Sequence, residues 1–390
     1  MNVPKLRFKE FNDEWQNKKI DELFKLSSGS TPATTEKNNY VGDINWISSG
    51  ELKSKYINKT INCISKKVSK SMMIYPKGTL LIALYGLEAE GVRGTASILN
   101  IDSTISQACM AFEPLNNNIT NEFMYYWYKK NGEWIGRKIA QGTKQQNLTS
   151  ELVKPLIVNY PQIIEQNKIE KMLSLLDRKI EFQSKKIEDL KLFKKGLINS
   201  IGKNIEIEKI PLKNILAEQN HKTIKNNEYE ILSSTSKGIY LQKDYFNKQA
   251  ASDNNVGYKI LKKNQLVLSP QNLWMGNINI NSKYNIGIVS PSYKIFDINN
   301  NIDIDFFDYW IKSPKALYEY KISSEQGASI VRRNLNMDLF YEIKVDIPKG
   351  KMQNKLGKII KLLNLKIQYN ENSLQKLQEL KKGLMQNMFV

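Results

Sequence analysis

Two stretches of the chain repeat apolar residues at alternating spacings of three and four. Seven of nine positions on each stripe are aliphatic, over four heptads. The first stripe consists of Ile169, Leu173, Leu176, Ile180, Gln183, Ile187, Leu190, Lys194 and Leu197, and the second of Leu356, Ile360, Leu363, Ile367, Asn370, Leu374, Leu377, Lys381 and Leu384. An apolar position every 3.5 residues is typical of a coiled-coil strand. The pattern therefore predicts two long helices, each of which needs a long partner.

The two helical stretches are copies of one sequence. "EQNKIEKMLSLLDRKI" at 165–180 returns as "MQNKLGKIIKLLNLKI" at 352–367, and the copies align without a gap from residue 147 to the end at a constant offset of 187. Pro161 falls on Pro348, and the Lys-Lys-Gly-Leu at 194–197 falls on that at 381–384. Repetition of this kind indicates two equivalent structural units.

Each apolar stripe is interrupted by polar residues at the same two positions, and Gln183 and Asn370 are the middle members of their stripes. If the helices pair antiparallel, these two amides meet and fix the register. A shifted register would leave a buried amide unpaired, at a cost of about 1–3 kcal/mol. The alternative is that both are unrelated polar residues on a wet seam, and the sequence leaves that open.

The segments ahead of the helices, 1–155 and 203–345, combine short apolar runs bounded by Gly, Ser and Pro with helical stretches. "GTLLIALYG" and "SQACMAFEP" predict strands in the first segment, as "NQLVLSPQN" and "SPSYKIFDI" do in the second. We expect an α+β fold with two similar mixed α/β domains. The helical segments 156–202 and 346–390 would pair as an antiparallel coiled coil about a pseudo-twofold axis.

Charge points to a polyanionic partner. The chain has 58 Lys and Arg against 39 Asp and Glu, a net charge of +19, and basic side chains gain Coulomb energy and release counterions at a phosphate backbone. Residues 161–200 and 348–390 supply +10 of this charge. The helices could therefore run near phosphate, or their lysines could simply flank a coiled coil. A Lys- and Asn-rich composition that only keeps the surface soluble also remains open.

The cysteines, the single histidine and the absence of long apolar runs indicate the cellular compartment and bear on metal binding. Cys63 and Cys109 are too few for a disulfide framework, and the single histidine, His221, cannot form a His-based zinc site. The first residues, "MNVPKLRFKEF", lack the apolar core of a signal peptide, and no run approaches the ~18 apolar residues of a membrane span. We expect a cytoplasmic protein without a metal site.

Catalytic equipment is not evident. The chain has no P-loop and no Gly-rich dinucleotide turn, and its nearest match to a methyltransferase amine-binding loop, Ser290-Pro291-Ser292-Tyr293, lacks the second proline. Acidic-x-Lys triplets of the nuclease type occur, as at 51–53, but a lysine-rich chain contains them by chance. We therefore expect a protein that is not an enzyme.

Binding equipment is abundant in two equivalent loops. "QGTKQQNL" at 141–148 echoes "QGASIVRRNL" at 326–335. Amides suit adenine edges and arginine suits guanine. Candidate DNA-binding residues in the first domain are Ser48, Ser49, Arg93, Gln107, Thr143, Lys144, Gln145, Gln146 and Asn147, and in the second Ser233, Ser234, Gln271, Asn272, Ser329, Arg332, Arg333 and Asn334. The two domains share one pattern of predicted elements but differ in their loops. We expect this of one scaffold that carries two different specificities.

This order of domain, helix, domain and helix resembles the specificity (S) subunit of type I restriction-modification systems. Its markers are Trp15, the two loops just quoted and both Lys-Lys-Gly-Leu helix ends. The resemblance implies a non-catalytic subunit in which target recognition domains at 1–155 and 203–345 each read one half of a bipartite, asymmetric site in double-stranded DNA. The helices at 156–202 and 346–390 would act as spacers.

The same resemblance implies partners that carry the chemistry. Two methyltransferase (M) subunits would dock on the helices, and restriction/translocase (R) subunits would join for cleavage. S-adenosylmethionine, ATP and Mg²⁺ would bind those partners, and no cofactor would bind this chain. Gly350 and Gly357 depart from a good helix, and we expect a frayed or bent first turn there. The rival hypothesis is a structural tether with two protein- or RNA-binding domains.

Overall fold

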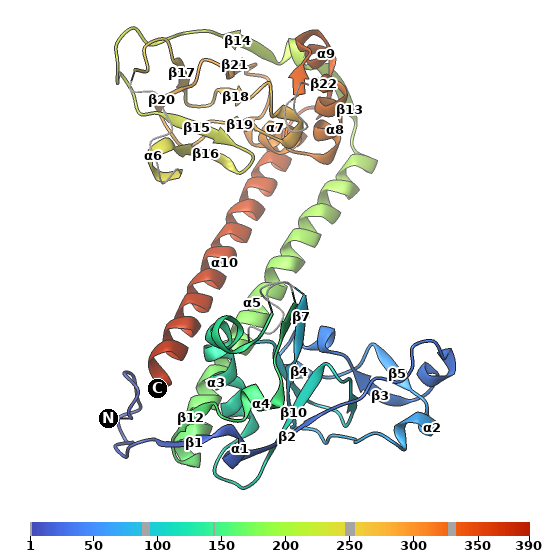
Figure 1. Cartoon of the computed structure of the whole chain (residues 1–390). Helices are drawn as coiled ribbons and strands as arrows, with labels where there is room; N and C mark the ends of the chain where they lie inside the picture. Colours follow the sequence, from blue (N-terminus) through green and yellow to red (C-terminus); the bar gives the residue numbers. More distant parts are fainter. Residues whose placement is uncertain (1, 88–93, 143–144, 246–253, 327–332) are drawn as a thin grey trace. The chain divides into compact units, whose positions relative to one another are not determined.

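The computed structural model describes residues 2–87, 94–142, 145–245, 254–326 and 333–390. The chain divides into two compact units, Met1–Ser184 with Asn372–Val390 (unit 1) and Lys185–Glu371 (unit 2). Each unit contains one mixed α/β domain and a segment of both long helices, α5 (Ile163–Asn204) and α10 (Met352–Met388) (Figure 1).

The domain of unit 1 is built on a five-stranded sheet of order β2-β10-β6-β8-β4, which is antiparallel except where β4 joins β8. Its strands are β2 (Phe24–Ser28), β4 (Tyr56–Ile57), β6 (Leu80–Ala83), β8 (Ala96–Leu99) and β10 (Cys109–Pro114). Smaller sheets are formed by β1 (Gln16–Lys19) with β12 (Ile157–Tyr160), by β3 (Ile44–Ile47) with β5 (Asn62–Ile64) and β9 (Thr104–Ile105), and by β7 (Tyr85–Leu87) with β11 (Gln145–Asn147).

Helix α3 (Asn121–Trp134), which continues as a π-helix over Ile135–Ile139, packs on this sheet and carries half of the buried aromatic residues of the core. The shorter helices of unit 1 are α1 (Ile20–Leu23), α2 (Lys66–Ser69) and α4 (Ser150–Val153). Trp15, Phe123 and Phe389 pack edge to face or tilted, so the end of α10 is part of the core of unit 1. Ile169 and Leu173 of α5 complete that core.

Unit 2 repeats the plan with a four-stranded sheet of order β14-β21-β18-β19. Its strands are β14 (Leu216–Gln219), β18 (Leu266–Leu268), β19 (Ile278–Ile280) and β21 (Lys294–Ile298). The strand pairs are β13 (Ile207–Pro211) with β24 (Lys344–Pro348), β15 (Leu232–Thr235) with β16 (Gly238–Leu241), β17 (Lys259–Lys262) with β20 (Ile286–Val289), and β22 (Ser324–Gln326) with β23 (Arg333–Leu335). The helices are α6 (Gln242–Tyr245), α7 (Ile304–Trp310), α8 (Pro314–Ile322) and α9 (Met337–Glu342).

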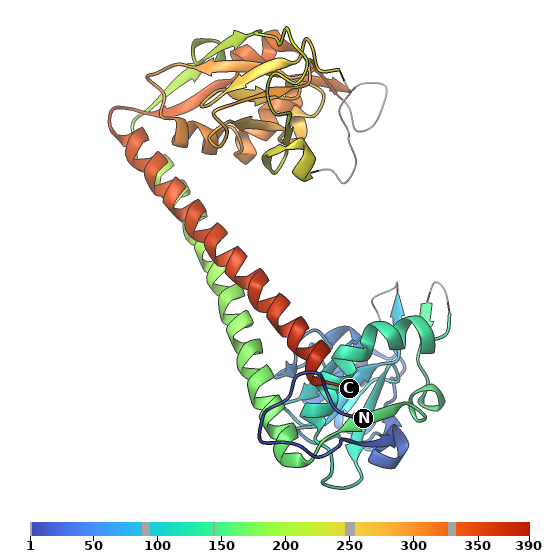
Figure 2. The ribbon, with the colours of Figure 1, turned by 90° about the vertical axis from the view of Figure 1, so that its left-hand side faces the viewer.

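In each unit a segment of α5 lies beside a segment of α10 (Figure 1 and Figure 2). In unit 2, Lys194 Nζ donates to Asn364 Oδ1 at 2.6 Å. Lys191, three residues before Lys194 on α5, pairs with Glu371, seven residues after Asn364 on α10. Residue numbers fall along α5 as they rise along α10, so these segments run antiparallel, as in the expected fold. The predicted spacer segments also contain strand: β12 and part of β24 fall inside 156–202 and 346–390.

The expectation for the two glycines needs correction. Gly350 lies before α10 and has a φ of +63°, so it forms the turn into the helix and is not a helical residue. Gly357 is helical and buried, and a Cβ atom there would overlap Asp303 Oδ1 of the domain. This glycine therefore permits a close approach between α10 and the start of α7, and is not merely a weak helix former.

Candidate nucleic-acid interface

In unit 1 the predicted binding loop extends from a short two-stranded ribbon. β11 pairs antiparallel with β7, with Asn147 opposite Tyr85 and Gln145 opposite Leu87. The main chains of Gln141 and Asn147 exchange hydrogen bonds of 2.9 and 2.8 Å, which closes the hairpin. The ring of Tyr85 is 41% exposed, so an aromatic face lies at the base of this ribbon.

Unit 2 builds the same hairpin from different residues. β22 and β23 pair with Gln326 opposite Arg333 and Ser324 opposite Leu335. The Arg333 N–H donates to Gln271 O at 3.2 Å, and Gln271 follows β18 as Tyr85 follows β6. We call the hairpin at 141–147 and the hairpin β22–β23 the exit hairpins. Each exit hairpin is bonded to the segment that follows an inner strand of the main sheet, β6 in unit 1 and β18 in unit 2.

The predicted DNA-binding residues do not all share one environment. Asn334, Gln107 and Gln271 are exposed, while Ser49, Asn147 and Asn272 are half-buried. The main chains of Gln145 and Gln146 lie in β11. Arg93, Thr143, Lys144, Ser329 and Arg332 lie outside the described residues.

Three of the predicted DNA-binding residues, Arg333, Ser48 and Ser234, make side-chain interactions inside the fold, and a fourth, Ser233, is buried. Arg333 donates from Nε to Ser324 Oγ at 3.0 Å and from Nη2 to Ser324 O at 2.6 Å, which ties the hairpin together. Ser48 and Glu51 form a capping box. Ser233 and Ser234 are buried, and Ser234 Oγ bonds to both Asn277 and Asn279 at 2.8 Å. A buried hydroxyl cannot reach a base edge, and that of Ser234 is also satisfied inside the fold, so Ser233 and Ser234 are poor candidates for direct contacts.

A charged cluster that the sequence alone did not reveal joins the domain of unit 1 to both helices. Lys381 of α10 pairs with Asp177 of α5 at 2.5 Å, and Tyr126 of α3 donates its hydroxyl to Asp177 Oδ2 at 2.8 Å. Lys55 contacts the Tyr126 hydroxyl at 2.9 Å and pairs with Glu122 at 2.5 Å. Burial and the Asp177 carboxylate raise the pKa of Tyr126, so its hydroxyl stays a donor. We call these residues the unit 1 junction.

Unit 2 has the equivalent junction with an amide, Asn364, in place of the Asp177 carboxylate. Lys194, Asn364 and Tyr309 stand where unit 1 has Lys381, Asp177 and Tyr126, and Lys194 Nζ lies 5.7 Å from the centroid of the Tyr309 ring. Burial lowers the pKa of Lys194. Lys194 and Lys381 are the second polar positions of the two stripes, and the signal that could have found the junction was this shared interruption.

A repeated glutamine attaches each domain to its helix. Gln166 is fully buried; its Oε1 accepts from Thr120 N at 3.1 Å and its Nε2 donates to Asn118 O at 2.7 Å and Pro161 O at 2.8 Å. Gln353 likewise accepts from Asp303 N at 3.1 Å and donates to Asn301 O at 2.8 Å. The "QNK" repeated in both copies marked these residues.

The predicted register pair cannot be assigned from one unit, because Gln183 belongs to unit 1 and Asn370 to unit 2. Asn370 is buried, and its Nδ2 donates to Lys366 O at 2.6 Å. The pairing of the two amides stays a prediction.

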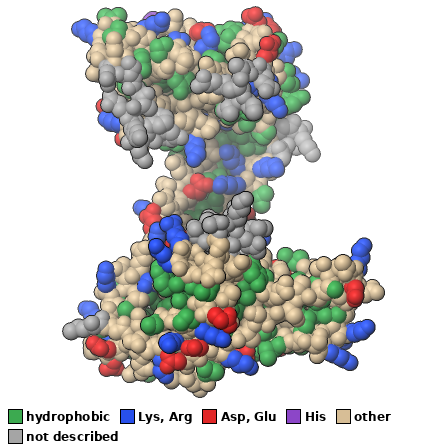
Figure 3. Space-filling model, viewed as in Figure 1, with side chains coloured by type: hydrophobic (Ala, Val, Ile, Leu, Met, Phe, Trp, Pro, Cys, Tyr) green, Lys and Arg blue, Asp and Glu red, His purple; other side chains and the backbone are tan. Residues whose placement is uncertain are grey.

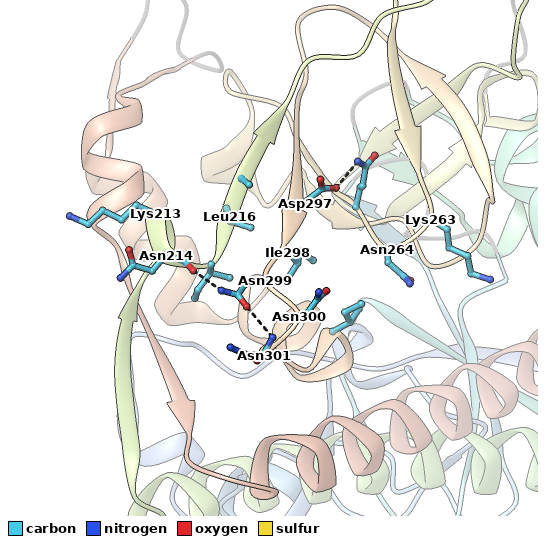
Figure 4. Close-up of a pocket in the computed structure, with 14 residues that line it drawn as sticks. Lys213, Asn214, Leu216, Lys263, Asn264, Asp297, Ile298, Asn299, Asn300 and Asn301 are labelled. Atoms are coloured by element: carbon cyan, nitrogen blue, oxygen red, sulfur yellow. Dashed lines mark hydrogen bonds between the residues drawn. The ribbon is translucent and has the colours of Figure 1, made fainter.

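A polar hollow of about 840 Å³ lies beside β14 and β21 of unit 2 (Figure 4). Its asparagines are bonded internally: Asn299 Nδ2 donates to Asn214 O at 3.3 Å, and Asn301 N donates to Asn299 Oδ1 at 3.0 Å. None of the predicted binding residues lines this hollow. On the face shown in Figure 3, Lys and Arg side chains are dispersed over both units among polar and hydrophobic ones.

The described part of the chain contains no helix long and apolar enough to cross a membrane. It also contains no group of three or more His, Cys, Asp and Glu side chains arranged to hold a metal ion.

Comparison with known proteins identifies the domain type. Residues 12–192 match the family model of the type I restriction modification DNA specificity domain. The chain is 31% identical over 198 residues to the type I restriction enzyme MjaIX specificity subunit of Methanocaldococcus jannaschii, an alignment that covers 48% of this chain and 44% of that protein. The match thus spans less than half the length of this curated relative.

Two solved structures share the fold over nearly the whole chain. The S subunit of a type I restriction-modification system from M. genitalium has a TM-score of 0.63 at 20% identity, covering 100% of this chain and 99% of that one. A chain from a structure on complex assembly and conformational transition of the type I R-M system has a TM-score of 0.50 at 8% identity, covering 95% and 96%. Residues 12–192 are therefore similar to the type I restriction modification DNA specificity domain, and the chain as a whole shares the fold of the S subunit structure.

Proposed function

We propose that this chain reads a bipartite, asymmetric target in double-stranded DNA, one half with each recognition domain. The observation that carries the proposal is the pair of exit hairpins. The hairpin closed by Gln141 and Asn147 and the hairpin β22–β23 lie at equivalent positions of the repeat, yet the residues between their ends, 142–146 and 327–332, differ in sequence and length. One frame with two sets of loop side chains suits two different half-sites.

The basic balance of the chain supports a phosphate partner, with a net charge of +19. Exposed Asn334, Gln107 and Gln271 can bond to base edges or phosphates, and Arg93, Lys144 and Arg332 remain candidates in the loops. The long helices set the spacing of the half-sites in this proposal, since a helix rises about 1.5 Å per residue. We propose a cytoplasmic location, which suits a subunit that acts on cellular DNA.

Exposed apolar residues on the helices support docking of partner subunits. Leu175 and Phe182 of α5 correspond, at the repeat offset of 187, to Leu362 and Tyr369 of α10, and all four are more than half exposed. A spacing of seven puts each pair on one helix face. Because the feature is duplicated, it suits two copies of one partner, which we identify as the methyltransferase subunits. S-adenosylmethionine, ATP and Mg²⁺ then belong to the methyltransferase and restriction/translocase subunits, and this chain is non-catalytic.

The deciding experiment exchanges one domain. Replacing residues 1–155 by the first recognition domain of another specificity subunit should change one half of the methylated sequence and leave the other half and the spacer unaltered. Methylome sequencing of cells that carry the hybrid with its methyltransferase partner measures this directly. A change in both halves would refute independent reading. The rival tether predicts no sequence-specific methylation and a flat salt dependence of duplex binding by the assembled complex.

A further inference from the structure

Unit 2 contains a cavity of about 600 Å³ between α5, α10 and α7. Its lining includes Lys191, Lys194, Lys195, Tyr309, Asn364 and Glu371. Glu371 pairs with Lys191 at 2.6 Å, which neutralises one of the three lysines. Lys194 is half-buried and bonds to a neutral partner, the amide oxygen of Asn364. The cavity therefore holds more positive than negative charge.

In unit 1 the equivalent position beside the lysine is occupied by the carboxylate of Asp177. Lys381 pairs with Asp177, and the Tyr126 hydroxyl bonds to the same carboxylate. At the repeat offset, Asn364 replaces Asp177, Gln368 replaces Glu181, and Lys191 replaces Gln378. These three substitutions each raise the charge of the unit 2 site by one, and the replacement of Ser184 by Glu371 lowers it by one, so the site is more positive than its counterpart by two charges. The carboxylate that acts on Lys194, Asp308, is itself paired with Lys312 at 2.9 Å. The half-buried ammonium group of Lys194 therefore still favours a further anion.

The charge around the cavity points to a polyanion. The helical segments of unit 2, 185–204 and 352–371, contain ten lysines and three acidic residues. The helical segments of unit 1, 163–184 and 372–388, contain seven basic and five acidic residues. A single carboxylate from a protein would need one cation, whereas a row of phosphates interacts with many. The excess in unit 2 favours a nucleic-acid backbone over an acidic side chain.

We propose that this cavity binds a backbone phosphate of the DNA that flanks the half-site read by unit 2. Lys194 and Lys195 are the cationic ligands, and Asn364 orients Lys194. The inference rests on the proposed function, since it adds a contact to the same DNA complex. It gives unit 2 a phosphate contact on the helices that unit 1 lacks, because Asp177 occupies the equivalent position.

The variant Asn364→Asp tests the site without removing a lysine. It gives Lys194 the carboxylate that Lys381 has in unit 1, so the fold should keep its stability while the cavity loses affinity for phosphate. We expect the complex assembled with its methyltransferase partner to bind its mapped target duplex more weakly. The slope of log affinity against log salt should fall by about 0.9, the value for one lost phosphate contact. Asn372→Asp is the matched control, because it adds the same charge to an exposed position of α10 in unit 1.

A second duplex separates the possible outcomes. If methylphosphonate linkages neutralise the DNA beside the second half-site, wild type and Asn364→Asp should bind it equally. Should Asn364→Asp match wild type on the natural duplex, the phosphate site is refuted while the proposed function stands. Loss of co-purification with the methyltransferase subunit would instead assign the cavity to a protein carboxylate and overturn the inference. Absence of sequence-specific binding by the wild-type complex would refute the proposed function itself.

Discussion

The two units differ at the contact between the N-terminal cap of a domain helix and the long helix beside it, which we call the joint. Glu170 of the long helix supplies a carboxylate there in unit 1, and Asp303 of the cap supplies it in unit 2. In unit 1, Thr120 caps α3, accepting from Phe123 N at 3.0 Å, and its hydroxyl donates to Glu170 of α5. In unit 2 the cap of α7 is Asp303, which accepts from Phe306 N at 2.8 Å, and the residue equivalent to Glu170 is Gly357. Of these two positions, unit 1 therefore has its carboxylate on the long helix, and unit 2 has its carboxylate on the cap.

This exchange shows that the two copies have diverged in pairs of residues. The cap residue and the helix residue occupy the same space at the joint. With Asp303 at the cap, the helix position must therefore be a glycine, Gly357, because a Cβ atom there would overlap the Asp303 carboxylate. The glutamines Gln166 and Gln353, in contrast, are retained with the same donors and acceptors. The retained contact fixes where the domain attaches, while the exchanged pair adjusts its surroundings.

The largest expected effect comes from breaking the exchanged pair. Gly357→Glu places a Cβ atom into Asp303 Oδ1 and adds a second carboxylate to a buried joint. We expect the free energy of unfolding of unit 2 to fall by about 3–5 kcal/mol. Native-state hydrogen exchange, which resolves the two units, measures this loss.

The double variant Asp303→Thr with Gly357→Glu restores the unit 1 pair and should recover most of the stability. Gly383→Glu is the control in the same helix, because a Cβ there meets nothing within 4 Å. It should be neutral or slightly stabilising. A double variant as unstable as Gly357→Glu alone would show that the two joints are not equivalent.

A smaller effect is expected from the retained glutamines. Gln166→Ala removes three hydrogen bonds from a fully buried position and should cost unit 1 about 3 kcal/mol. Gln353→Ala removes two from a half-buried position, where water can replace the amide, and should cost unit 2 about 1 kcal/mol. The same hydrogen-exchange measurement reports both losses.

The neighbouring exposed asparagines, Asn167 and Asn354, provide matched controls as alanine variants, and both should be near neutral. Equal losses in the two glutamine variants would mean that burial does not set the difference between the units.

Much of the architecture could be predicted from the sequence because it depends on periodicity. The heptads predicted both long helices, and the repeat predicted two similar units. The antiparallel direction was an expectation of the proposed fold and does not follow from the heptads alone. The polar positions Lys194 and Lys381 were also visible. Their partners were not, because Asp177 and Tyr126 lie 204 and 255 positions from Lys381 and meet it only in the fold.

Site prediction was weaker for a physical reason. The echo of Ser48-Ser49 in Ser233-Ser234 identified equivalent positions, but equivalence does not determine burial, and Ser234 lies inside unit 2 with two asparagine partners. Gly357 was expected to weaken its helix, whereas the structure makes it necessary for the approach of Asp303. Loop residues such as Lys144 and Arg332 remain predictions from chemistry alone.

The smallest expected effect concerns the protonation of the unit 1 joint. Burial raises the pKa of Glu170 above its ordinary value of 4.5, and this outweighs the hydrogen bond from Thr120 and the charge of Lys55. Because the folded state holds the proton more tightly than the unfolded chain, the stability of unit 1 should fall as pH rises from 4.5 through the raised pKa.

Glu170→Gln keeps the shape and an acceptor for Thr120 but cannot ionise, so this component of the pH dependence should vanish from unit 1. Gly357 leaves unit 2 without a carboxylate at the equivalent position, and its amides therefore serve as the internal control in the same sample. Hydrogen exchange corrected for its intrinsic pH dependence gives both profiles. If the variant retained the decline of wild type, the decline would have to come from another group of unit 1, and burial of Glu170 would not be its cause.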